Sequence, residues 1–316
     1  MQIRIVDLFC GIGGIAEASH LLAQHDRTDE TLISGIGRVQ PKVVAAIDID
    51  RSVASLYQHH HGIVPRCSTI ESLPEIGDDS TAELDMWWMS PPCQPYTVRG
   101  SQRGFHDARS QALARLIELI PLERPRFLGL ENVPAFEGSL HHQQLQRVLR
   151  DTGYHYQQYI LCPTELGTPM RRKRFYLLAK RDGKRFADIP RKIEKRPFTE
   201  FITEAGWEDK TLHVPAESVS HYEGAMNIVD IRNRDAIAAC FTSAYGKSPI
   251  RSGSYLHCSA RGQIRRFSPN EIAMLMGFRS DFFSTCNLSQ RSQYRLIGNS
   301  LSVPVVYELL SVLLAN

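Results

Sequence analysis

The first 180 residues alternate short apolar runs with segments of helical periodicity, and this alternation limits the possible folds more than any other feature of the chain. The apolar runs are predicted strands and cover residues 3–9, 43–49, 84–89, 127–130, 159–161 and 175–179. Between two of them, Leu113, Leu116, Ile117 and Ile120 recur at the spacing of one helix face. This order predicts an α/β fold, in which a mostly parallel sheet carries helices on both faces. Ligands of such sheets bind beyond the carboxyl ends of the strands.

The character of the chain changes after residue 180. Residues 181–198 are basic and are interrupted by Pro and Gly, and the chain stays polar and irregular to about residue 262. A helical pattern returns from Arg265, and the last helical segment is apolar. We therefore predict a large domain over 1–180, a small second lobe over 181–262, and a C-terminal segment, 263–316, that returns to the large domain.

Composition excludes several classes of protein. No run of about 18 apolar residues is present, which argues against a transmembrane helix. The N-terminus lacks the pattern of a secretory signal, so we expect a cytoplasmic protein with no membrane partner. The seven cysteines show neither CxxC pairs nor zinc-ligand spacing, so we expect reduced thiols and no metal, and the triplet His59–His61 is interpreted as exposed surface. The net charge of +3 decides little, but 29 of the 37 basic residues are Arg, which suits contacts to phosphates and bases.

The first motif, DLFCGIGG at residues 7–14, ends a predicted strand in a glycine turn and opens a helix. Glycines allow close approach of the backbone to a ligand, and the helix N-terminus adds a positive dipole. The next strand ends in Asp48, whose carboxylate can accept hydrogen bonds from ribose hydroxyls. These features predict a nucleoside cofactor, and they do not distinguish a dinucleotide from S-adenosylmethionine.

Three further motifs adjoin predicted strands. SPPCQP at 90–95 presents Cys93 from a loop, which makes it a candidate nucleophile. ENV at 131–133 places Glu131 where a carboxyl group can act as a general acid. RRKR at 171–174 is either a substrate contact or a solvated basic turn.

Taken together, these motifs resemble the cytosine-5 methyltransferase family. DLFCGIGG resembles its cofactor loop, PPCQ its nucleophile loop, ENV its catalytic glutamate and RRKR its arginine motif, while GNS at 298–300 with Val303-Pro304 resembles its last motif. The resemblance covers residues 5–180 and 265–314. Met170 stands where the arginine motif usually begins with Gln, but Arg172 and Arg174 remain. The resemblance implies a Rossmann-like domain that binds S-adenosylmethionine and releases S-adenosylhomocysteine, with a small target-recognition lobe.

The resemblance also implies roles for the matching residues. Cys93 would add as a thiolate to carbon 6 of cytosine, and Glu131 would protonate or hydrogen-bond ring nitrogen N3. Arg172 and Arg174 would supply positive charge near the thiolate and grip the base or its phosphate. The implied cofactor contacts are Phe9 and the backbone of Cys10, Gly11, Ile12, Gly13, Gly14 and Ile15, Asp48 at the ribose, Ile49 with Ile70 and Glu71 at the adenine, and Asn299 and Ser300 at the methionine carboxylate.

Within this family the chain is most similar to the DNA-methyltransferase type-two branch, whose substrate is cytosine 38 in the anticodon loop of tRNA of the tRNA-Asp type. The likeness lies in the short second lobe, in IESL, in LGTPMRRKRFYLLAK and in Cys240-Phe241-Thr242. It implies a monomeric tRNA-binding enzyme in which Gln94, Cys240, Phe241 and Thr242 contact the substrate. The alternative is a DNA cytosine-5 methyltransferase acting on duplex DNA, such as one of a restriction-modification system. Arg and aromatic residues of the region would stack on bases or hold phosphates, unless they are ordinary surface residues: Tyr245, Arg251, Tyr255, Arg261, Arg265 and Arg266.

Overall fold

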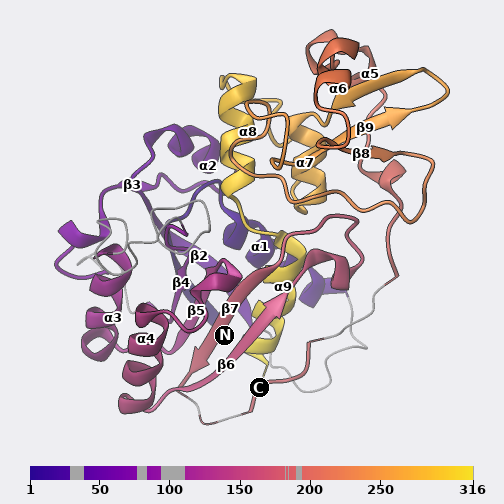
Figure 1. Ribbon diagram of the computed structural model, residues 1–316. Helices are drawn as coiled ribbons and strands as arrows, with labels where there is room; N and C mark the ends of the chain where they lie inside the picture. Colours follow the sequence, from indigo (N-terminus) through magenta and orange to yellow (C-terminus); the bar gives the residue numbers. More distant parts are fainter. Residues whose placement is uncertain are drawn as a thin grey trace. The chain divides into compact units, whose positions relative to one another are not determined.

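The computed structural model describes residues 1–28, 39–76, 84–93, 111–181, 183, 185–189 and 194–315. The chain divides into two compact units, each of which is described by itself. Unit 1 comprises Met1–Leu161, Lys173–Ile189 and Val306–Asn316, and unit 2 comprises Cys162–Arg172 and Pro190–Val305 (Figure 1).

Unit 1 is built on a seven-stranded sheet in the order β3-β2-β1-β4-β5-β7-β6. Strand β7 is antiparallel to both its neighbours, and the other pairs are parallel. This topology confirms the predicted α/β fold with a mostly parallel sheet. The strands are β1 (Gln2–Leu8), β2 (Gln40–Asp48), β3 (Arg66–Cys67), β4 (Met86–Met89), β5 (Phe127–Asn132), β6 (His155–Leu161) and β7 (Arg174–Lys180).

The strand order brings the sequence motifs of unit 1 to one edge of the sheet. Strand β1 lies between β2 and β4, so the loops that follow β1 and β4 leave the sheet side by side. Strand β7 begins at this same edge because it is antiparallel to β5, and Phe175 pairs with Asn132 at the end of β5. The antiparallel strand therefore delivers Arg174 to the edge where parallel strands end.

Helices lie on both sides of this sheet, and Figure 1 shows α3 and α4 together on one side. The face that they cover is the core of unit 1, where Leu116 of α3 and Leu145 of α4 are buried with Trp87 and Leu128 of the sheet. The apolar face predicted for residues 113–120 is the buried face of α3. The helices are α1 (Gly14–Thr28), α2 (Ala54–His61), α3 (Gln111–Glu123) and α4 (Leu140–Asp151).

Unit 2 holds a three-stranded sheet in the order β10-β9-β8, formed by β8 (Asn227–Asp230), β9 (Ser254–Cys258) and β10 (Gln263–Arg266). Its helices are α5 (Ala205–Glu208), α6 (Ala216–His221), α7 (Pro269–Leu275) and α8 (Gln290–Asn299). Because β10 pairs with β9, the boundary predicted after residue 262 falls inside a strand pair. Residues 162–172 and 263–305 belong to unit 2, so only the last part of the predicted C-terminal segment belongs to unit 1.

The last helix, α9 (Val303–Leu314), is apolar along its length. Among the described residues, one stretch, Gln290–Leu314, is long and apolar enough to span a bilayer by length and hydropathy alone. It consists of α8 and α9, and 72% of its most apolar window is buried inside the protein. Burial to this extent is typical of a helix in a protein core.

Candidate functional site

The loop that leaves β1 and enters α1 holds three residues with positive φ, namely Phe9 (61°), Gly11 (51°) and Gly13 (88°). Positive φ is costly for a non-glycine residue such as Phe9. At Gly11 a Cβ atom would meet nothing within 4 Å, whereas at Gly13 it would lie 2.3 Å from Nε2 of His61. The two glycines therefore serve different needs. Gly13 lets α2 pack against the loop, and Gly11 leaves open space at the loop.

Asp48, at the end of β2, holds this loop in place. Its Oδ2 accepts a hydrogen bond from the backbone N–H of Gly11 at 2.8 Å, and its Oδ1 accepts one from Asp50 at 2.8 Å. Burial raises the pKa of Asp48, and these two hydrogen bonds act in the opposite direction. Next to it, the side chain of Ile49 is 68% exposed. These three features fit a nucleoside cofactor. The open turn at Gly11 allows contact with the backbone, the carboxylate of Asp48 suits ribose hydroxyls, and the exposed side chain of Ile49 suits the base.

Below the loop, the hydroxyl of Tyr57 donates to Oδ2 of Asp7 at 2.9 Å, and both groups are buried. Burial raises the pKa of Asp7 well above its usual value, against the opposing effect of the Tyr57 hydrogen bond. The imidazole of His61 stacks edge-on against Tyr57 and lies 3.3 Å from the carbonyl oxygen of Ile12. His61 is thus half-buried under the loop, which corrects its interpretation as exposed surface.

The adenine contacts predicted for Ile70 and Glu71 divide between core and surface. Ile70 is 3% exposed and packs in the hydrophobic core, so its side chain does not face a ligand. Glu71 is exposed. The structure therefore leaves the backbone of Ile70, and not its side chain, for the predicted adenine contact. Cys10, Ile12 and Ile15 are also buried, which leaves their backbone for the predicted cofactor contact.

Cys93 lies just beyond β4 and is a half-buried thiol outside any disulfide. The segment that carries it is fixed at two points. The backbone N–H of Ser90 donates to the carbonyl of Leu8 at 3.2 Å, and Nδ2 of Asn132 donates to the carbonyl of Pro91 at 3.2 Å. Asn132 is a positioning residue that the sequence interpretation missed, although it stands inside the ENV motif. Gln94, a predicted substrate contact, lies outside the described residues.

Glu131 and Arg174 form an ion pair at the edge where β5 ends and β7 begins. Nε of Arg174 lies 3.1 Å from Oε1 of Glu131, and the two side chains are 17% and 12% exposed. Asn132, which follows Glu131, holds the Cys93 segment. Unit 1 therefore brings the predicted nucleophile, acid and one arginine to the same edge of one sheet.

Arg172 belongs to unit 2 and is 4% exposed. Its Nη1 donates to the carbonyl of Phe241 at 3.1 Å and lies 3.6 Å from Sγ of Cys240. Its Nη2 donates to the carbonyls of Gly298 and Ser300 at 3.2 and 2.5 Å. A buried guanidinium with these partners does not grip a base or a phosphate, so the grip predicted for Arg172 is corrected. It positions two backbone segments.

These two segments also pack directly on each other. A Cβ atom at Gly298 would lie 2.3 Å from the carbonyl carbon of Thr242, so only glycine fits there. The GNS motif is thus fixed against the Cys240-Phe241-Thr242 segment within unit 2. Of the two predicted cofactor contacts, Asn299 is exposed and Ser300 is 7% exposed.

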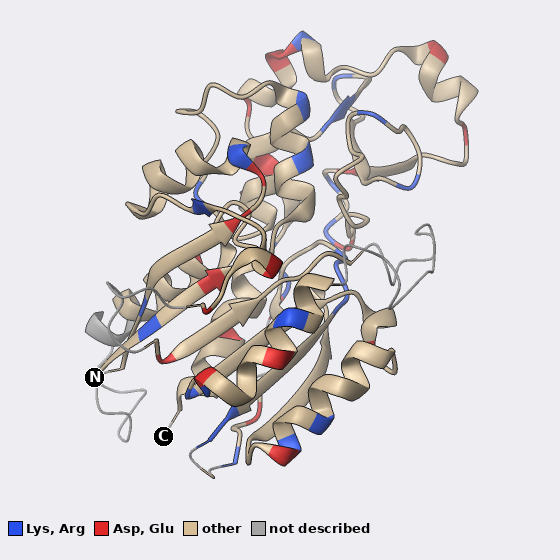
Figure 2. Ribbon diagram, turned by 90° about the vertical axis from the view of Figure 1, so that its left-hand side faces the viewer, with Lys and Arg blue, Asp and Glu red and all other residues tan. Residues whose placement is uncertain are grey.

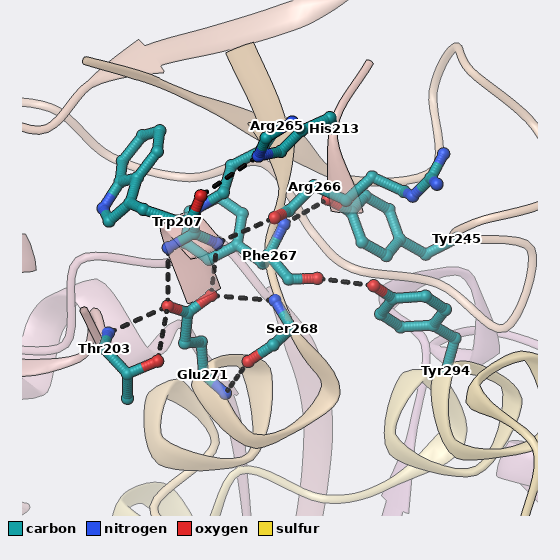
Figure 3. Close-up of polar contacts among 10 residues, drawn as sticks. All are labelled: Thr203, Trp207, His213, Tyr245, Arg265, Arg266, Phe267, Ser268, Glu271 and Tyr294. Carbon is teal, nitrogen blue, oxygen red and sulfur yellow. Dashed lines mark hydrogen bonds and ion pairs between the residues drawn. The ribbon is translucent and has the colours of Figure 1, made fainter. Parts of the chain in front are cut away.

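Several residues predicted to contact the substrate are core residues of unit 2. Phe241 is 1% exposed, and its ring centroid lies 4.9 Å from that of Tyr245 and 5.0 Å from that of Phe267. Tyr245, Tyr255 and Arg265 are buried as well, and Figure 3 shows Tyr245 and Arg265 within a network of internal hydrogen bonds. The substrate contacts predicted for their side chains are therefore corrected. Cys240, Thr242 and Arg266 are partly accessible, and Arg251 and Arg261 are exposed.

A metal is not suggested by the side chains that the structure describes. Within that part of the chain, no group of three or more His, Cys, Asp or Glu residues is arranged to hold a metal ion.

Comparison with known proteins identifies what this arrangement is similar to. The sequence profile of the C-5 cytosine-specific DNA methylases matches residues 3–233 and 220–315. The tRNA (cytosine(38)-C(5))-methyltransferase of Schizosaccharomyces pombe is 29% identical over 341 residues, covering 99% of this chain and 97% of that protein. The crystal structure of the S. pombe Dnmt2 methyltransferase superposes with a TM-score of 0.81, at 29% identity over 99% of this chain and 98% of that one. An Entamoeba histolytica methyltransferase, at 22% identity, shares the fold with a TM-score of 0.83 over 99% of this chain and 98% of that one.

Proposed function

Because the chain belongs to the C-5 cytosine-specific DNA methylase family, we propose that it methylates carbon 5 of cytosine 38 in tRNA, with S-adenosylmethionine as methyl donor. One observation carries the chemistry: the Glu131–Arg174 ion pair stands at the sheet edge where Asn132 holds the Cys93 segment. The choice of tRNA is supported by whole-length similarity to proteins named for that reaction, such as the S. pombe enzyme.

The side chains of unit 1 supply the steps that activate the base. The thiolate of Cys93 forms a bond to carbon 6 of the cytosine, and Glu131 holds a proton at ring nitrogen N3, so electron density moves toward carbon 5. Arg174 fixes the orientation of the Glu131 carboxyl group. Carbon 5 accepts the methyl group that S-adenosylmethionine supplies. Loss of the carbon 5 proton to a base then restores the double bond as the Cys93 sulfur leaves.

The residues that would hold the cofactor are those of the loop after β1 and the end of β2. The backbone of the Gly11 turn has open space beside it, and Asp48 already holds that turn through one carboxylate oxygen. Each carboxylate oxygen keeps a further lone pair for a ribose hydroxyl. Ile49 offers an exposed apolar surface for the adenine.

The size of unit 2 favours a loop substrate over a duplex. A base in an RNA loop is already partly unstacked, whereas a base in duplex DNA must be unpaired at a cost of a few kcal/mol. The three-stranded sheet of unit 2 has strands of only four or five residues. Such a unit suits recognition of a loop by shape and phosphate contacts.

Methyl transfer from tritiated S-adenosylmethionine tests the proposal, with a tRNA-Asp transcript, the same transcript carrying uridine at position 38, and duplex DNA offered in parallel at matched salt. We expect label on the first transcript alone. We expect Cys93→Ala to abolish it, whereas Cys286→Ala, which removes another half-buried thiol, retains it. Label on DNA alone would keep the chemistry and overturn the substrate. No label on any substrate would overturn the proposed activity.

A further inference from the structure

A pocket of unit 1 lies at the end of the sheet opposite the Cys93 edge. It has a volume of about 410 Å³ and is lined by Arg124, Arg126, Thr152, Gly153 and Arg181. Arg126 directly precedes β5, and Arg181 directly follows the antiparallel β7, so the two meet at this end, where Arg181 N–H donates to the carbonyl of Arg126 at 3.3 Å. The length of β5 separates this pocket from Asn132 by about 20 Å. The pocket is therefore distinct from the site that holds Glu131.

The pocket is strongly basic. Three of its five lining residues are arginines, and none of the described lining residues is acidic. Two described acidic residues adjoin the lining in sequence and are engaged elsewhere: Glu123 accepts from the backbone N–H of Ile76 at 2.8 Å, and Asp151 pairs with Arg147 at 3.6 Å. Asp182, which follows Arg181, lies outside the described residues. Figure 2 shows acidic and basic residues interspersed over the chain, so a lining of this composition is local.

The guanidinium groups keep donors for a ligand. Nη2 of Arg124 reaches the carbonyl of Thr152 only at 3.5 Å, and Nη1 of Arg126 faces the sulfur of Met1 at 3.6 Å. Arg124 and Arg181 are exposed and Arg126 is half-buried. The positive charge also reaches Tyr154 behind the pocket, since burial raises the pKa of Tyr154 to about 12 against the opposing effect of Arg181 and Arg124.

The backbone at Arg124 is strained, with a φ of 47°. Arg124 follows the last residue of α3, and its N–H donates to the carbonyl of Ile120 at 2.9 Å. Glycine is the residue preferred at such a left-handed helix end, because a side chain there is strained. The chain thus carries an arginine in the pocket lining at a position where glycine would be more stable.

We propose that the pocket of Arg124, Arg126 and Arg181 binds a phosphate group. An oxyanion satisfies guanidinium donors through charge-assisted, bidentate hydrogen bonds and relieves the repulsion among three like charges. The ligand class is a phosphate-bearing anion, either free or part of a nucleic-acid backbone. This inference is independent of the proposed methyl transfer.

Thermal unfolding of the full chain in sodium phosphate and in sodium chloride of equal ionic strength tests the site. We expect phosphate to raise Tm with the logarithm of its concentration, by about 2 °C at ten times the dissociation constant. Arg124→Gly is the sharpest variant, because it removes both charge and strain. It is expected to raise Tm in chloride and to lose the rise in phosphate. Arg181→Gln is expected to lose the phosphate rise as well.

Two controls keep the result specific. Arg234→Gln removes an exposed arginine of unit 2, outside the pocket, and should keep the phosphate response. Cys93→Ala should also keep it, because the pocket does not depend on the reaction site. If phosphate does not raise the Tm of the parent above its value in chloride, or if Arg124→Gly and Arg181→Gln respond as the parent does, the proposed site does not exist.

A uridine 16-mer, which contains no cytosine, distinguishes the two sources of phosphate. If the 16-mer binds, loses affinity at least about tenfold in Arg124→Gly and is displaced by inorganic phosphate, the pocket takes a nucleic-acid backbone. If phosphate stabilises the parent and the 16-mer does not compete, the pocket takes a free phosphate. Either result supports a phosphate site.

Discussion

Nε of Arg174 lies 3.1 Å from Oε1 of Glu131, and the two residues come from antiparallel neighbouring strands. Both side chains are largely withdrawn from water, so the pair is more than a weak surface contact. Nη1 of Arg174 donates to the carbonyl of Lys173 at 2.8 Å, which holds the guanidinium in place beside Oε1 of Glu131. We therefore assign Arg174 to the orientation of Glu131 and Arg172 to a separate structural task in unit 2.

Replacement of Glu131 by Gln tests the acid role. The amide oxygen can still accept a hydrogen bond from Arg174, so we expect the fold to persist, but the side chain can no longer deliver a proton. The rate of methyl transfer to tRNA should fall by at least about two orders of magnitude. Single-turnover kinetics with saturating tRNA measure this rate, and the melting temperature serves as the folding control. A variant as fast as the parent would remove Glu131 from the reaction.

Replacement by Lys is expected to lower mainly stability at Arg172 and mainly the reaction rate at Arg174. The buried guanidinium of Arg172 donates to three backbone carbonyls, and Arg172→Lys replaces it by a single ammonium group. We therefore expect the free energy of unfolding to fall by about 2–4 kcal/mol. Arg174→Lys keeps a charge beside Glu131, so we expect a stability loss below about 1 kcal/mol but a slower reaction per folded molecule. Urea unfolding and single-turnover rates measure both quantities. Equal stability losses would refute the distinction.

The sheet of unit 1 could be predicted because buried strands leave a plain signal. Six of its seven strands coincide with apolar runs of the sequence, but β3 has two exposed residues and no such run. The strands of unit 2 were missed for a related reason. Strand β8 is largely exposed and β10 carries Gln263, Arg265 and Arg266, so neither shows a clear apolar pattern.

At the site, the sequence could place residues that end strands but not residues whose role depends on distant partners. Cys93, Glu131 and Arg174 follow from strand ends and a known motif order. Arg172 stands in the same basic run as Arg174, and its partners lie 68 to 128 residues further along the chain. The sequence RRKR alone does not show that Arg172 is buried and Arg174 half-buried. The contact of His61 with Gly13 likewise appears only once α2 packs on the loop.

The buried carboxyl group of Asp7 predicts a pH dependence of stability. Its pKa in the folded protein lies well above the value of about 3.8 for an exposed group, because burial disfavours the charge. Between these two values the folded state binds more protons than the unfolded state, so the contribution of Asp7 is greatest below the lower value and is lost as pH rises through the higher one. Each unit of pKa difference corresponds to about 1.4 kcal/mol.

Asp7→Asn isolates this effect. The amide oxygen still accepts the hydrogen bond from Tyr57, and no charge forms at high pH. We expect the variant to be more stable than the parent at pH 8, with the difference shrinking toward pH 4. Melting temperatures of both proteins over this range provide the measurement. Parallel pH profiles would show that Asp7 imposes no cost on folding.

Arg265 and Glu271 predict strong energetic coupling inside unit 2. Both side chains are fully buried and joined by two hydrogen bonds of 2.7 Å, and the carboxylate also accepts from the backbone N–H groups of Thr203 and Ser268 (Figure 3). Glu271→Gln leaves Arg265 buried without a countercharge, so we expect a loss of about 3–5 kcal/mol. Arg265→Met should cost a similar amount, because it leaves the Glu271 carboxylate buried without a countercharge. The double variant should lose clearly less than the sum of the two, since it buries no unpaired charge. Urea unfolding of the four proteins measures this coupling, and additive losses would show that the pair acts only through packing.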